Sequence, residues 1–142
     1  PEGEPAFLAW VRYALQVPDF RASDVVHRAT FTQLSPRELA AYDAPFPDEI
    51  ANAGPRIFPS LVLRSKGVPH EEWAQLQALD KPFLTLWAPG DPILGQWQPF
   101  FTENVKGAAG QLHATFEKAS HFLQEDVAED LARHMIAFIA ST

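Results

Sequence analysis

The chain has no cysteine among its 142 residues, which excludes disulfides, thiolate metal ligands and cysteine nucleophiles within it. Basic residues are also few. Eleven lysines and arginines stand against eighteen aspartates and glutamates, and the formal net charge is −7. Because the cations are scattered as well as outnumbered, neither nucleic acid nor an anionic membrane is expected as a partner.

Other familiar signals are missing as well. No apolar run approaches the ~20 residues that cross a bilayer, and "PEGEP" at residues 1–5 lacks the features of a signal peptide. We therefore expect a cytoplasmic protein, and residue 1, a proline, is not expected to be the natural start. The histidines lack metal-ligand spacing, and there is neither a G-x-S-x-G elbow nor a glycine-rich phosphate loop. No metal or other cofactor is predicted.

The residues present favour a folded α/β protein, since 46% are hydrophobic. In the first half, short helices alternate with proline-rich loops. One apolar helical face ends at Pro18 and contains Phe7, Leu8, Trp10, Val11, Ala14 and Leu15. Ser35 and Glu38 predict a capping box for a helix that runs to about Tyr42. A further helix is expected over about 48–54, ended by Gly54.

The second half alternates between helix and strand. Helices are predicted over 71–79, 97–105 and 124–140, and strands over the apolar run 81–88 and over 112–117. Strand, helix, strand and helix with short loops form an α/β unit whose strands are parallel. Two strands alone would leave apolar faces and backbone groups uncovered, so we infer that the chain is part of a larger fold.

Two titratable residues follow the predicted strands. Asp91 comes after the first strand and His121 after the second. Ligands of open α/β sheets bind at the carboxyl ends of strands, and adjacent strands lie ~4.8 Å apart, so these side chains can form a hydrogen bond. A carboxylate that orients an imidazole suggests two members of a catalytic triad. The alternative is structural: Asp91 and Pro92 form a turn, and His121 caps the last helix.

Several motifs together resemble the C-terminal half of a haloalkane dehalogenase. They are "FLAW" (7–10), "AYDAPFPD" (41–48), "RIFPSLVL" (56–63), "GDPILG" (90–95) and "SHFLQED" (120–126), in the order that the family has them. The resemblance implies the C-terminal part of an α/β-hydrolase fold. Residues 1–66 would form a helical cap segment, and residues 67–142 would supply the last strands and helices of the core.

The resemblance also implies roles for individual residues. Asp91 would be the triad acid, His121 the base, and Trp10 a donor to the halide. Six residues would line the substrate cavity, namely Phe7, Phe58, Pro59, Val62, Ile93 and Leu94. The family's aspartate nucleophile would lie upstream of residue 1. The implied partners are a small halogenated alkane, water, a halide ion and the N-terminal half of the same hydrolase, with no cofactor.

Two other interpretations remain open at this point. An epoxide hydrolase of the same fold also pairs histidine with a carboxylate, but it polarises its substrate with cap tyrosines. Tyr13 and Tyr42 are present, whereas Trp10 favours a halide. The second is a non-catalytic half of a cleaved or split hydrolase, which would function by associating with the other half.

Overall fold

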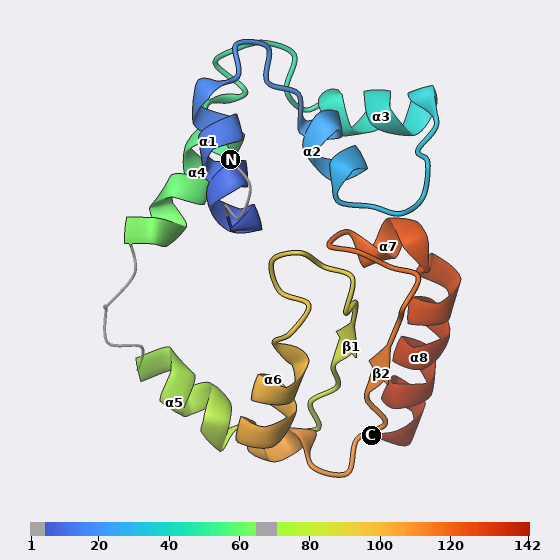
Figure 1. Ribbon diagram of the computed structural model, residues 1–142. Helices are drawn as coiled ribbons and strands as arrows, with labels where there is room; N and C mark the ends of the chain where they lie inside the picture. The colour runs from blue at the N-terminus through green and yellow to red at the C-terminus, as the bar shows by residue number, and fades with distance from the viewer. Residues whose placement is uncertain (1–4, 65–70) are drawn as a thin grey trace. The chain divides into compact units, whose positions relative to one another are not determined.

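The computed structural model describes residues 5–64 and 71–142, and these form two units (Figure 1). The N-terminal unit comprises Pro1–Val68 and the C-terminal unit Pro69–Thr142. The predicted boundary between residues 66 and 67 lies outside the described residues.

The described part of the N-terminal unit contains four helices. Helix α1 (Ala6–Gln16) packs beside α4 (Ala53–Arg64), and α2 (Ala22–Arg28) packs beside α3 (Pro36–Asp43), as Figure 1 shows. The apolar face predicted to end at Pro18 does form on α1, and Val11 and Ala14 on it are buried. The face is only partly covered, however, because Leu8 and Leu15 stay exposed.

The start of α3 confirms the predicted capping box. The Glu38 backbone N–H donates to the Ser35 hydroxyl at 3.3 Å, and the Ser35 N–H donates to the Glu38 carboxylate at 2.7 Å. Pro36 occupies the first turn, where a backbone N–H would find no acceptor within the helix. The lack of an N–H in proline therefore costs no helical hydrogen bond there. Together these bonds pair two backbone donors that the helix itself leaves open.

The helix predicted over 48–54 is wrong. Residues 48–52 are a bend and turns, and α4 begins at Ala53, so that Gly54 lies in its first turn. Gly54 predicts a helix end, but glycine is tolerated at a helix start as well as at its end. Pro59 lies inside α4, and its side chain is fully buried, so packing offsets the lost backbone hydrogen bond.

Two parallel strands form the sheet of the C-terminal unit. Strand β1 (Leu86–Trp87) pairs with β2 (Ala114–Thr115), with Leu86 opposite Ala114 and Trp87 opposite Thr115. The parallel pairing was expected from the sequence. Both strands are shorter than the predicted runs 81–88 and 112–117 because, among the described residues, each has only one neighbour to bond.

Helices flank this strand pair in Figure 1. Helix α5 (Glu71–Ala78) and α6 (Gln98–Asn104) agree with prediction, and a 3₁₀ turn, η1 (Lys106–Ala108), follows α6. The Trp87 ring of β1 lies 5.6 Å from the Phe101 ring of α6, and Phe116 after β2 lies 5.6 Å from His134 of the last helix. The strand pair is therefore packed against a helix on either side.

The last predicted helix, 124–140, is divided into two. A short α7 (Leu123–Asp126) is followed by α8 (Ala128–Ser141), and Val127 between them departs from helical geometry with φ −141° and ψ 38°. No helix in the two described stretches is long and apolar enough to span a bilayer. The buried apolar residues of this unit are small, namely Ala88, Val105, Ala108 and Ala119.

Candidate functional site

Asp91 is held in a tight turn directly after β1. Its backbone N–H donates to the Ala88 carbonyl at 3.1 Å, and its carboxylate Oδ1 accepts the Ile93 N–H at 2.8 Å. The Gly95 N–H closes the turn on the Asp91 carbonyl at 3.0 Å. A Cβ at Gly95 would stand only 2.4 Å from the Pro89 carbonyl oxygen, so the turn requires glycine there. These contacts within the turn orient the Asp91 carboxylate independently of His121.

His121 meets that carboxylate from the loop after β2. Its Nδ1 lies 2.8 Å from Asp91 Oδ2. The Asp91 side chain is 9% exposed and that of His121 is 29% exposed. An ionised carboxylate has no hydrogen to give, so Nδ1 is the donor and Nε2 of the neutral ring keeps its lone pair. The structure thus brings together Asp91 and His121, as the sequence predicted. It leaves Nε2 of His121, the more exposed of the two, able to accept a proton.

Two neighbours of His121 were not singled out from the sequence. Ser120 is buried, and its backbone N–H donates to the Asp126 carboxylate at 2.9 Å. The Ser120 hydroxyl lies 3.4 Å from the Gly90 carbonyl, beside Asp91. The only signal for these contacts was the short motif "SHFLQED", which places an acidic residue five positions after the histidine.

Trp10 and Phe7 lie together on α1 in the N-terminal unit. Their ring centroids are 5.7 Å apart, with the planes inclined at 76°. This edge-to-face contact orients the Trp10 indole on its helix. Because Trp10 and the Asp91–His121 pair belong to different units, the proposed halide contact stays a prediction.

The predicted cavity residues differ in their surroundings. On α4, Pro59 is buried, whereas Phe58 is 62% exposed and Val62 is also exposed. In the C-terminal unit, Ile93 and Asp91 line one hollow of about 430 Å³ together with Pro92, Gly95, Gln96 and Trp97. Leu94 is exposed and is not among the residues that line it. The structure therefore brings Ile93 to Asp91, and it leaves the roles of the others as predictions.

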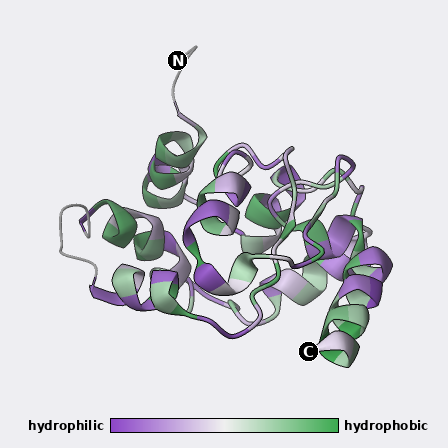
Figure 2. Ribbon diagram, turned by 90° about the horizontal axis from the view of Figure 1, so that it is seen from below, coloured by the Kyte–Doolittle hydropathy of each residue, from purple (hydrophilic) through white to green (hydrophobic). Residues whose placement is uncertain are grey.

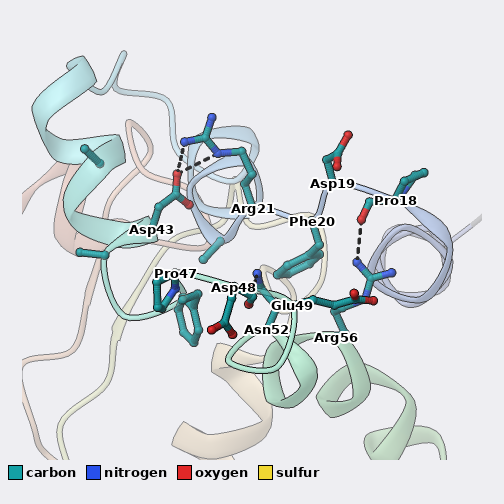
Figure 3. Close-up of a pocket in the computed structure, with 14 residues that line it drawn as sticks. Pro18, Asp19, Phe20, Arg21, Asp43, Pro47, Asp48, Glu49, Asn52 and Arg56 are labelled. Atoms are coloured by element: carbon teal, nitrogen blue, oxygen red, sulfur yellow. Dashed lines mark hydrogen bonds and ion pairs between the residues drawn. The ribbon is translucent and has the colours of Figure 1, made fainter.

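A second hollow, of about 630 Å³, lies in the N-terminal unit (Figure 3). Its charged side chains bond largely to other protein groups. Arg21 forms an ion pair of 2.7 Å with Asp43, and Arg56 donates to the Pro18 carbonyl at 3.5 Å. None of the predicted site residues lines it. This hollow therefore belongs to the scaffold of the N-terminal unit.

The carboxylate of Asp43, beside that hollow, accepts hydrogen bonds from Ser23 and Arg21. Burial acts to raise its pKa, but hydrogen bonds from the Ser23 backbone and hydroxyl, together with Arg21, hold the pKa below its ordinary value. Tyr13 shows the opposite effect, since burial and the neighbouring Asp24 raise the pKa of its hydroxyl.

In the described ranges, no group of three or more histidine, aspartate or glutamate side chains could hold a metal ion.

Comparison with known proteins adds an independent finding. The chain is 40% identical over 139 residues to a haloalkane dehalogenase of Mycolicibacterium paratuberculosis, a match that covers 94% of this chain and 46% of that protein. It is 35% identical over 138 residues to a haloalkane dehalogenase of Psychrobacter cryohalolentis, with the same coverage. The chain is similar to haloalkane dehalogenases. A third, haloalkane dehalogenase 1 of Mycobacterium tuberculosis, is 40% identical over 141 residues.

This similarity confirms the resemblance predicted from the motifs. The chain spans about half the length of the haloalkane dehalogenases it matches, as expected for a segment of a longer fold. No family model matches it. Haloalkane dehalogenases imply an α/β-hydrolase fold, and the parallel strands with their flanking helices are compatible with that fold.

Proposed function

We propose that this chain supplies the triad acid, the base and one halide ligand of a haloalkane dehalogenase. The observation that carries the proposal is the hydrogen bond of 2.8 Å between Asp91 and His121, formed at the ends of two adjacent parallel strands. Similarity to haloalkane dehalogenases supports the reaction class. We further propose that residues 1–66 form the cap segment and 67–142 the C-terminal part of the core.

The first step needs a nucleophile that this chain does not contain. An aspartate from the N-terminal half would attack the carbon that bears the halogen. A carbon–oxygen bond forms as the carbon–halogen bond breaks, giving an alkyl-enzyme ester and a halide ion. The Trp10 indole would donate its N–H to the departing halide. An uncharged donor stabilises the developing charge without holding the product as tightly as a cation would.

His121 and Asp91 act in the second step, the hydrolysis of the ester. His121 Nε2 removes a proton from water, and the water oxygen attacks the ester carbonyl, which releases the alcohol and restores the carboxylate. Asp91 keeps the proton on Nδ1 and stabilises the imidazolium that forms. General-base assistance of this kind is worth ~10²- to 10⁴-fold. Because the nucleophile is already ionised, His121 is not required in the first step.

The other two interpretations are less well supported. An epoxide hydrolase would use cap tyrosines, here Tyr13 and Tyr42, as donors to substrate. The Tyr13 hydroxyl donates instead to Asp24 at 3.3 Å, and similarity to haloalkane dehalogenases favours the halide reaction. A non-catalytic half remains compatible with the exposed apolar residues, although such a half would not need the oriented Asp91–His121 pair. The cytoplasmic location expected from the sequence stays a prediction.

The decisive experiment uses the complete protein with His121→Gln. Glutamine cannot act as a general base, so the first turnover should release halide while the alkyl ester accumulates and steady-state turnover falls by at least ~10²-fold. Rapid-quench halide measurement and intact-protein mass spectrometry detect the burst and the ester. His134→Gln, on α8, is the matched control and should behave as the unaltered protein. A His121→Gln protein with normal turnover would refute the mechanism.

A further inference from the structure

Ser120 lies between the two loops that carry the proposed acid and base. It immediately precedes His121, and its exposed fraction is only 4%. Its hydroxyl donates to the carbonyl of Gly90, the residue before Asp91, at a long 3.4 Å. This bond joins the loops independently of the Asp91–His121 contact. Gly90 and Ser120, which precede the proposed acid and base, are therefore hydrogen-bonded to each other as well.

The backbone of Ser120 is held more firmly than its hydroxyl. Its N–H donates to the carboxylate Oδ2 of Asp126, at the end of α7, at 2.9 Å. A hydrogen bond from a buried N–H to an ionised carboxylate is stronger than one between neutral groups. Losing it would leave the N–H unpaired, at the position where the chain turns to present His121.

We infer that Asp126 and Ser120 are positioning residues that hold the His121 imidazole on Asp91. Asp126 fixes the backbone immediately before His121, and the Ser120 hydroxyl aligns that backbone with the Asp91 loop. The inference rests on the proposed function for its kinetic consequence, though not for its geometric content. Neither side chain contacts substrate in this scheme.

The inference predicts an effect on one chemical step alone. The imidazole acts only when water attacks the ester, so a displaced His121 slows ester hydrolysis and leaves halide release in the first turnover unchanged. A displacement of about 1 Å can cost up to ~10²-fold in rate. A side chain that merely stabilised the fold would instead reduce the active fraction, and both steps would fall together.

The kinetic test compares three variants of the complete protein. Asp126→Ala removes the acceptor and should slow ester hydrolysis ~10- to 100-fold, with alkyl-enzyme accumulating. Asp126→Asn keeps an oxygen that can accept from Ser120 and should recover most of the rate. Ser120→Ala removes only the long bond and should have the smallest effect. Glu129→Gln, an exposed carboxylate in the first turn of α8, is the charge-matched control.

A second measurement separates this inference from the proposed function. The His121 Nδ1–H, bonded to a carboxylate, should give a low-field proton NMR signal in the complete protein, identified by its loss in His121→Gln. Asp126→Ala should shift or broaden that signal, while Glu129→Gln should preserve it. An unchanged signal in Asp126→Ala, or equal slowing of both chemical steps, overturns the inference. If unaltered protein released no halide, the proposed function alone would fail, since the signal still tests the positioning.

Discussion

Asp91 shows at the scale of a residue that a turn and a functional contact need not compete. From the sequence, the Asp91–Pro92 turn and the triad acid were alternative interpretations. In the structure one carboxylate oxygen accepts the Ile93 N–H at 2.8 Å, as in an Asx-turn, and the other faces His121 at 2.8 Å. A carboxylate has lone pairs enough for both contacts, so the turn orients the proposed triad acid.

A substitution of Trp10 tests the halide contact. Trp10→Phe in the complete protein keeps an aromatic ring against Phe7 but removes the indole N–H. Halide affinity should fall by roughly tenfold, the loss expected for a hydrogen bond to a charged group. Fluorescence titration with chloride or bromide measures it. Leu8→Ala, an exposed position of the same helix, is the control. Unchanged affinity in Trp10→Phe would remove Trp10 from the site.

The pKa of Asp43 predicts a pH dependence of stability. Because that pKa is lower in the folded state than its ordinary value of 3.8, the unfolded state binds the proton first as the pH falls. The stabilisation is therefore complete above about pH 3.8 and disappears as the pH falls through the lower folded value. The difference in unfolding free energy between unaltered protein and Asp43→Asn should shrink accordingly.

Urea unfolding at several pH values checks this expectation. Asp80→Asn provides the comparison, because the Asp80–Lys106 pair is exposed on both sides and should contribute little. A difference for Asp43→Asn that stayed constant down to pH 2 would contradict the assigned role of its hydrogen bonds.

At the scale of an element, local signals predicted some boundaries well and others poorly. The capping box of α3 was readable because all its partners lie within four residues. The position of α4 was not readable, because Gly54 and Pro59 both indicate helix ends. The helix forms across Pro59 because the side chain of Pro59 is buried by packing. Strand lengths also depend on neighbours, and no local pattern could limit β1 to Leu86–Trp87.

A half-buried histidine, His113, supports the start of the strand pair. The Thr85 N–H donates to His113 Nδ1 at 3.1 Å, so Nε2 carries the ring hydrogen and donates to the Ala108 carbonyl at 2.9 Å. His113 thus bridges the backbone before β1 to η1. Its neutral tautomer is defined by these two partners.

Replacement of His113 tests this bridge. His113→Leu leaves the Thr85 N–H unpaired and removes one of the two donors to the Ala108 carbonyl, which keeps its bond from the Gln111 N–H. The change should lower the unfolding free energy of the complete protein by about 1–3 kcal/mol. Chemical denaturation measures the change. His134→Leu makes the same chemical change at an exposed position of α8, where the ring contacts Phe116. Equal losses in the two variants would show that the bridge contributes nothing specific.

At the scale of the whole molecule, the exposed apolar residues are the notable feature. On α8, Met135, Ile136 and Ile139 are more than half exposed, and Figure 2 shows hydrophobic residues along that helix beside hydrophilic ones. On α4, Phe58 and Val62 are exposed as well. Apolar surface of this kind is typical of faces that another segment covers.

We therefore expect the isolated chain to associate. Purified alone, it should form oligomers or aggregates and bind a hydrophobic dye, and co-expression with the N-terminal half of the hydrolase should suppress both effects. Light scattering and dye fluorescence provide the measurement. Ile136→Lys with Ile139→Lys should reduce dye binding by the isolated chain, whereas Glu129→Lys, on the same helix, should not. A monomeric chain without dye binding would argue against the proposed larger fold.

The sequence by itself determined the family resemblance, the alternation of helix and strand in the C-terminal unit, and the two candidate residues Asp91 and His121. These depend on residue types and short spacings, which local physics and motif order make readable. The tertiary structure alone decided that Asp91 and His121 touch, that Ser120 bonds to Asp126 and to Gly90 beside them, and that the last helix is divided at Val127. Contacts between residues thirty positions apart depend on strand pairing and turn geometry, and neither is encoded within a single local window.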